Sequence, residues 1–132
     1  MLAEAGHQVV LHARSKERSR AVEAALPGGS AAVIGDLSVL SETVAVAEHA
    51  TRHGPCDAVI HNAGIYQPGS RRQVTVDGLE QTFQVNVLGP YVLTALIPVP
   101  NRLIYLSSGL ASGGSIDLDD LMRQHRRWSG SD

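Results

Sequence analysis

Four short apolar runs in this 132-residue sequence end in residues that could bind a ligand. The runs are followed by Ala13-Arg14, Asp36-Leu37, Asn62-Ala63-Gly64 and Ser107-Ser108. Arg14 offers a rigid fork of donors that suits a phosphate monoester, whereas a site for an unphosphorylated ribose would place a carboxylate there. Asp36 could accept a hydrogen bond from the amine of a purine, with the backbone and side chain of Leu37 against the ring. These residue types would suit a nucleotide.

Asn62, Ala63 and Gly64 form the sharpest of the four patterns. An asparagine can fix a loop by hydrogen bonds to its backbone, while Ala63 and Gly64 leave bare backbone against which a ring or ribose could lie. The alternative is a tight turn that needs Gly64 at positive φ. Arg14 could likewise only cap the end of a sheet, and Asp36-Leu37 could be a simple turn into a helix.

The sequence between these residues predicts the elements that position them. Apolar runs predict strands over 7–13, 31–35, 58–61 and 102–106. Helical periodicity predicts helices from the N-cap Ser15 to Leu26, from the N-cap Ser38 to His53, and from Asp77 to Ile97 with a kink at Pro90. Residues 1–5 resemble the end of a helix closed by Gly6, and 118–125 a short helix.

Strands of four to seven residues that alternate with helices predict parallel pairing through right-handed crossovers. We therefore expect an α/β fold with a doubly wound parallel sheet, in one domain. Ligands bind such sheets outside the carboxyl ends of the strands, where all four patterns fall.

Composition narrows the class of protein. A formal net charge of −2 gives no general attraction to nucleic acid or an anionic membrane. No apolar run approaches the roughly 20 residues that span a bilayer. Cys56 is the only cysteine, so no intrachain disulfide is expected and a cytoplasmic location is favoured. His49 and His53 are spaced for zinc, but no third ligand is placed, and histidines suit the last turn of a helix, so no metal site is predicted.

Several segments together resemble the short-chain dehydrogenase/reductase family. "HNAG" at 61–64 is similar to its Asn-Asn-Ala-Gly strand exit, with His61 in place of the first Asn. "TVDGLEQTFQVNVLGPYVLTALI" is similar to its asparagine-bearing helix, and "RLIYLSSGLA" to its serine-bearing strand. "VVLHARS" and "GDLS" match its second and third strands. The resemblance implies a Rossmann-type NAD(P)-binding domain over residues 1–132.

The resemblance also implies chemistry: hydride transfer between a nicotinamide and a carbonyl or alcohol substrate. Ser108 would bind the substrate oxygen, and Asn86 would help hold a proton-relay water. The cofactor would contact Arg14, Asp36, Leu37, Asn62, Ala63 and Gly64. Arg14 stands where members that prefer NADP carry a basic residue, so NADP(H) is expected over NAD(H).

Two parts of the family pattern are missing from the sequence. The glycine-rich turn would precede Met1, and no tyrosine has a lysine four residues later, Lys16 being the only lysine. The last residues resemble the segment before that tyrosine in retinol dehydrogenases. We therefore expect an incomplete Rossmann domain without its first, central strand, inactive alone, with unpaired sheet edges through which chains could associate. The alternative is a non-catalytic nucleotide-binding or scaffold protein derived from the same fold.

Overall fold

The computed structural model describes residues 2–23, 31–67, 71–109, 111 and 114–125. The strands are β1 (Val10–Ala13), β2 (Ala31–Ile34), β3 (Ala58–His61) and β4 (Arg102–Tyr105). The helices are α1 (Lys16–Glu23), α2 (Leu40–Thr51), α3 (Gln81–Phe83) and α4 (Gly89–Leu96). A π-helical turn, η1 (Gln84–Leu88), joins α3 to α4, and a 3-10 turn, η3 (Leu118–Asp120), follows β4. The predicted order of strands and helices is confirmed, although residues 24–26 of the first predicted helix lie outside the described residues.

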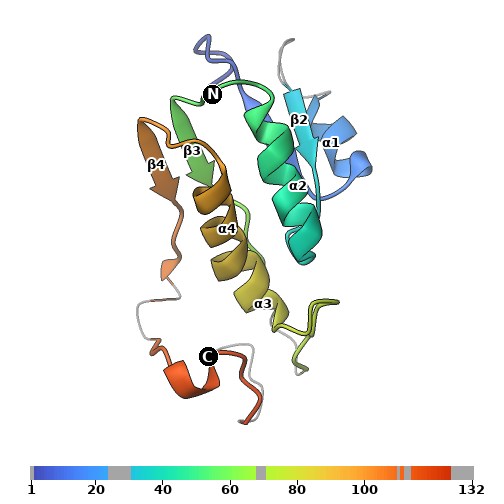
Figure 1. The fold of residues 1–132 in the computed structure, drawn as a ribbon, viewed down its shortest axis with the longest axis vertical. Coiled ribbons are helices and arrows are strands. Elements are labelled where there is room, and N and C mark those ends of the chain that lie inside the picture. Colours follow the sequence, from blue (N-terminus) through green and yellow to red (C-terminus); the bar gives the residue numbers. More distant parts are fainter. Residues whose placement is uncertain (1, 24–30, 68–70, 110, 112–113, 126–132) are drawn as a thin grey trace.

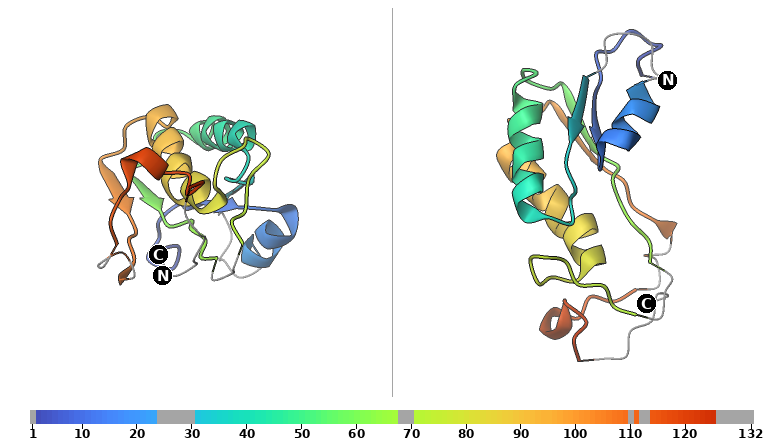
Figure 2. Two further views of the ribbon diagram at one scale, coloured as in Figure 1. Left: turned by 90° about the horizontal axis from the view of Figure 1, so that it is seen from below. Right: turned by 90° about the vertical axis from the view of Figure 1, so that its right-hand side faces the viewer.

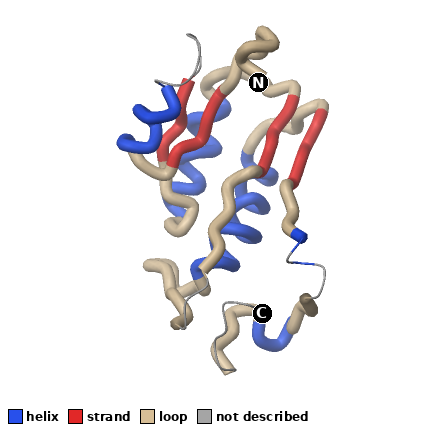
Figure 3. Tube along the Cα trace, turned by 180° about the vertical axis from the view of Figure 1, so that it is seen from behind, coloured by secondary structure: helices blue, strands red, loops and turns tan. Residues whose placement is uncertain are grey.

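The four strands form two separate parallel sheets rather than one. β1 pairs with β2 from Val10↔Ala31 to Ala13↔Ile34, and β3 pairs with β4 from Ala58↔Arg102 to His61↔Tyr105. Figures 1 and 3 show the two pairs side by side, with no described strand between β1 and β3. The interruption falls where the family resemblance places the central first strand.

Helices lie on both faces of the β1–β2 sheet, as a doubly wound arrangement requires. In Figure 2, α1 lies on the face of β1 and β2 opposite to α2 and α4. α2 and α4 pack against each other, and the buried core lies around them. It consists of Val33, Leu37, Val46, Ala47, Val85 and Leu93. The core therefore joins the β1–β2 sheet to the helices, because it takes residues from β2, α2, η1 and α4 and none from β3 or β4. The β3–β4 sheet contacts α4 through His61 and Thr94.

Two of the predicted boundaries are confirmed by their capping bonds. Ser15 is the N-cap of α1, because its Oγ accepts from Arg18 N at 3.3 Å. Gly6 has a φ of +85°, and His7 N donates to Leu2 O at 3.1 Å, the pattern that closes a helical turn.

The prediction that Ser38 caps the second helix is wrong. Its N–H and hydroxyl both donate to Asp36 Oδ1, and α2 begins two residues later at Leu40. The first N–H of α2 donates instead to Asp77 Oδ2 at 2.8 Å. A carboxylate 37 residues away in the sequence therefore stabilises this helix terminus, where an anion is favoured by the helix dipole.

The third predicted helix starts later than Asp77 and is irregular before Pro90. Glu80 caps α3 by accepting from the backbone N–H groups of Thr82 and Phe83. In the π-helical turn that follows, Gly89 N donates to Gln84 O, five residues back. Pro90 has no N–H to donate, so the regular bond pattern is already broken at this point. The structure thus has a π-helical turn directly before Pro90, and the predicted kink stays a prediction.

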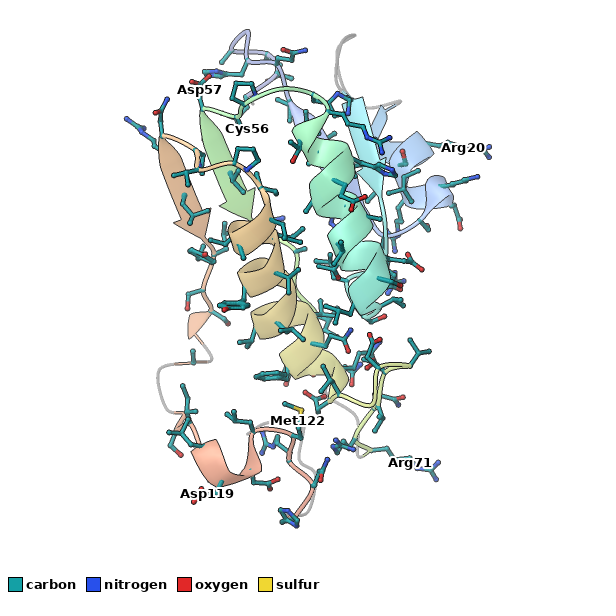
Figure 4. The ribbon with its side chains drawn as sticks, viewed as in Figure 1. Arg20, Cys56, Asp57, Arg71, Asp119 and Met122 are labelled. Carbon is teal, nitrogen blue, oxygen red and sulfur yellow. The ribbon has the colours of Figure 1, made fainter. Side chains whose placement is uncertain are left out.

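The segment after β4 crosses to the end of the molecule beyond α3. Figure 4 places Met122 and Arg71 there, and Arg72 Nε donates to Met122 O at 2.7 Å. The short helix predicted over 118–125 is limited to η3, Leu118–Asp120. Cys56 and Asp57 lie at the opposite end, before β3 (Figure 4).

Candidate functional site

The carboxyl ends of all four strands point toward the same end of the molecule (Figure 1). Pairing continues just past the strands: Gly35 N donates to Ala13 O at 3.1 Å, and Leu106 N donates to His61 O at 3.0 Å. The exits of β1 and β2 are therefore neighbours, as are those of β3 and β4. The structure brings the four predicted exits together in two pairs.

At the first pair, Arg14 is exposed and Asp36 is half-buried. The backbone N–H of Asp36 donates to Glu42 Oε2 at 2.7 Å, and its Oδ1 accepts from both donors of Ser38. These bonds fix the orientation of the Asp36 carboxylate, and Oδ2 accepts no hydrogen bond from the described residues. The arrangement places a guanidinium and an oriented carboxylate at adjacent strand exits.

Leu37 lies in a different environment from the one expected for a ring contact. Its side chain is only 3% exposed and belongs to the core. The expected apolar contact with a purine is therefore not offered by the Leu37 side chain, because that side chain fills the space beside Gly89. A role for Leu37 in binding stays a prediction for its backbone.

Two features at this pair of exits were missed from the sequence. His12 Nε2 donates to Gly35 O at 2.7 Å, which links the two exits through a side chain. A Cβ on Gly35 would lie 2.5 Å from Val46 Cγ2 and 3.1 Å from Glu42 O. Gly35 is therefore required by the close approach of α2, and a glycine directly after an apolar run was the only signal of this.

At the second pair, Asn62, Ala63 and Gly64 are all exposed after β3. Among the described glycines only Gly6, Gly54 and Gly78 have positive φ. The alternative of a tight turn that needs Gly64 at positive φ is therefore wrong. Three small or short residues leave this stretch of backbone open to a ligand, as the nucleotide interpretation requires.

Asn86 holds this loop against the helix. Its Oδ1 accepts from Ile65 N at 2.8 Å, and its Nδ2 donates to Ile65 O at 2.9 Å. The π-helical turn around Asn86 presents the side chain to the loop; such turns are frequent at functional sites. These two bonds fix the orientation of the amide, and the relay role expected of Asn86 stays a prediction.

Ser107 and Ser108 follow Leu106, which is hydrogen-bonded to the last residue of β3. Both serines are exposed, and Ala111 N donates to Ser108 O at 3.0 Å. The predicted oxygen-binding serine thus lies just beyond the strand exit that adjoins Asn62. Its catalytic role stays a prediction.

His61 is a further side chain of this region whose surroundings the sequence did not reveal. It is 8% exposed, and its ring stacks on Tyr105 with the centroids 4.8 Å apart. Its Nε2 lies 3.0 Å from Thr94 Oγ1 on α4. Burial lowers the pKa of His61 below the ordinary value of 6.5. The residue before the Asn62 loop is therefore a buried imidazole that favours its neutral form.

Within the described ranges, no three histidine, cysteine, aspartate or glutamate side chains are grouped to hold a metal ion. His49 and His53 are both exposed. None of the helices in the described part of the chain has the length and apolar character needed to cross a bilayer.

Parallel strands that alternate with helices, with polar residues at the strand exits, are typical of the Rossmann type of α/β fold. Residues 1–102 match the family model described as short chain dehydrogenase. The chain therefore belongs to the short-chain dehydrogenase family. It is 44% identical over 127 residues to an uncharacterized oxidoreductase of Emericella nidulans, which covers 95% of this chain and 50% of that protein. The chain spans about half the length of three curated relatives that it matches.

Solved structures agree with this assignment. An uncharacterized protein from Mycobacterium paratuberculosis superposes with a TM-score of 0.85 at 30% identity, over 98% of this chain and 47% of that one. A blue fluorescent protein from a metagenomic library, solved in complex with NADPH, has a TM-score of 0.63 at 29% identity, over 85% and 50%. Human retinol dehydrogenase 14 is 37% identical over 65% of the chain, so the retinol-dehydrogenase-like subgroup stays a prediction.

The residues present fit part of a dinucleotide. Arg14 is an exposed donor fork for a phosphate, Asp36 has an oriented carboxylate, and 62–64 offers open backbone. This combination of a cation, a hydrogen-bond acceptor and open backbone would suit the adenosine half of such a ligand.

Proposed function

We propose that this chain is part of an NADP-dependent oxidoreductase that acts on a small carbonyl or alcohol compound. The observation that carries the cofactor preference is the exposed Arg14 at the exit of β1, beside the exit of β2 that bears Asp36. A permanent cation here would bind the additional phosphate of NADP, where a carboxylate would select the ribose of NAD. Asn62, Ala63 and Gly64 would offer backbone to the same ligand.

The remaining predicted roles concern the substrate. When bound, the cofactor supplies or accepts a hydride. Ser108 would hydrogen-bond the substrate oxygen from the exit of β4, and Asn86 would keep the Asn62 loop in place through Ile65. Preorganised donors of this kind stabilise charge that develops on an oxygen.

A chimaera tests the cofactor preference. This chain would replace the matching half of the Emericella nidulans oxidoreductase, and the same chimaera would carry Arg14→Ala beside it. Loss of a hydrogen-bonded charge costs about 1.5–3 kcal/mol, so Arg14→Ala should raise the Kd of NADPH roughly 10- to 100-fold. The Kd of NADH should change little. Arg18→Ala, another exposed arginine nearby on α1, is the control. Equal binding of both cofactors, unaffected by Arg14→Ala, would refute the preference.

The 132-residue chain alone should be inactive and self-associating. Between β1 and β3 no described strand satisfies the facing edges, and unpaired edges recruit further strands. Sedimentation should show oligomers that grow with concentration. A cooperative urea transition of a monomer, with the m-value usual for this length, would contradict self-association.

We also propose a cytoplasmic location for the protein. A single cysteine, half-buried beside Asp57, fits a compartment that keeps thiols reduced. Imaging of the fluorescently tagged protein in its host would test this, and a signal confined to an organelle would contradict it.

A further inference from the structure

The exits of β3 and β4 are joined by a chain of three side chains as well as by backbone. Thr94 Oγ1 on α4 lies 3.0 Å from His61 Nε2 and 2.6 Å from the Tyr105 hydroxyl. The rings of His61 and Tyr105 stack directly, with an interplanar angle of 27°. One threonine hydroxyl thus bridges the last residues of two neighbouring strands, each of which leads into a predicted functional loop.

The direction of the bonds in this chain depends on the proton at His61. When Nε2 carries no proton, Thr94 can donate to it and accept from Tyr105. When Nε2 carries a proton, it can only donate, so Thr94 Oγ1 accepts from it and the threonine proton becomes available to Tyr105. Tyr105 is 53% exposed, which leaves its own hydroxyl proton free to turn to solvent. The hydroxyl of Thr94 therefore links the proton at His61 Nε2 to the exit of β4.

The surroundings of His61 contain little to compensate a positive charge. On β4, Tyr105 stacks against the ring, and Arg102 lies at the far end of the strand pair, beside Ala58. α4 carries no charged residue, and its Tyr91 is exposed. β3 has no other ionisable side chain, and Asp57 precedes its first residue. A charged imidazole would therefore be drawn toward solvent, away from Thr94.

We propose that neutral His61 is a positioning residue that holds the Asn62–Gly64 loop against the exit of β4 through Thr94 and Tyr105, and that protonation releases this hold. Any effect on catalysis rests on the proposed function, in which loop 62–64 contacts the cofactor and Ser108 contacts the substrate. The effect on the position of the loops does not rest on it, because His61, Thr94 and Tyr105 contact one another within the chain.

Nuclear magnetic resonance of the ¹⁵N-labelled chimaera between pH 8 and 4.5 tests the proposal without any cofactor, because the isolated chain is expected to self-associate. Acidification should shift the amides of 62–64 and 107–108 with one midpoint, equal to that of the His61 ring. Thr94→Val keeps the shape of the side chain but removes the bridge, and Tyr105→Phe removes the end of the chain. In both variants the shift at 107–108 should be lost while His61 still titrates.

His53→Asn is the control, because His53 is exposed and lies before β3. It should leave the shifts at both loops unchanged. A shift at 107–108 that persists in both bridge variants, or a midpoint at the two loops that differs from that of the His61 ring, would overturn the proposal. Failure of the chimaera to bind NADPH would refute the proposed function and leave this result standing.

Discussion

The side chain of Asn86 is paired with the backbone of Ile65 through two hydrogen bonds, of 2.8 and 2.9 Å. The side chain of Asn86 thus satisfies both backbone groups of Ile65, as a neighbouring strand would. Asn62, Ala63 and Gly64 are held at one end by His61, the last residue of β3, and at the other by Ile65. Their position therefore depends on the bonds between Ile65 and Asn86.

Loss of this pair should expose the Ile65 amide. Asn86→Ala removes both bonds, each worth about 1 kcal/mol, so hydrogen exchange at Ile65 should be at least about fivefold faster. Asn86→Asp keeps an acceptor for Ile65 N and should preserve most of the protection. Equal exchange rates in the wild-type chain and in Asn86→Ala would show that the pair does not form in solution.

Gly35→Ala should destabilise the chain through a collision with α2. The added Cβ would lie 2.5 Å from Val46 Cγ2, and overpacking of this kind costs about 1–3 kcal/mol. Thermal unfolding should show a midpoint several degrees lower. Gly109→Ala, with no atom within 4 Å of its added Cβ, should leave the midpoint unchanged. The same midpoint for both variants would contradict the close approach of α2.

The two candidate caps of α2 can be separated by a pair of variants. Asp77→Ala removes the acceptor of Leu40 N and should cost about 1 kcal/mol, seen as faster exchange of that amide. Ser38→Ala removes only a hydroxyl bond to Asp36 and should leave the Leu40 amide protected. The reverse result would restore Ser38 as the cap.

Acid should destabilise the chain through His61. Burial lowers its folded-state pKa below 6.5, so the unfolded chain binds more protons as the pH falls through 6.5. The contribution of the neutral ring to stability is complete above pH 6.5 and is lost as the pH falls toward the folded-state pKa. His61→Asn should flatten this part of the stability profile, measured as the thermal midpoint against pH. An unchanged slope would contradict the burial of His61.

Local patterns were sufficient to predict much of this fold. The apolar runs placed all four strands, and Ser15 and Gly6 capped their helical turns as expected because both bonds involve near neighbours in the sequence. Asp77 was missed because it reaches α2 across 37 residues, and no spacing rule connects it to Leu40. The interruption between β1 and β3 was predicted from the family resemblance alone, because no local sequence pattern gives the order of strands in a sheet.

The candidate site divides in the same way. The exposure of loop 62–64 and Arg14 agrees with residue types that suit a ligand, and their binding roles stay predictions. The buried side chain of Leu37 could not be predicted, because an apolar residue after a strand fits a ring and a core equally well. The links from His61 to Thr94 and from His12 to Gly35 join residues that only the tertiary packing brings together.

The π-helical turn at Gln84–Leu88 is equivalent to a one-residue insertion into an α-helix. Deleting one residue from it would restore a regular helix, but would rotate every later side chain by about 100° relative to the preceding turn. Thr94 would then leave His61, and Leu93 would leave the core. The length of the segment between Glu80 and Pro90 is therefore constrained more strictly than the residue type at most of its positions. Natural variants should differ here by substitutions and not by insertions or deletions.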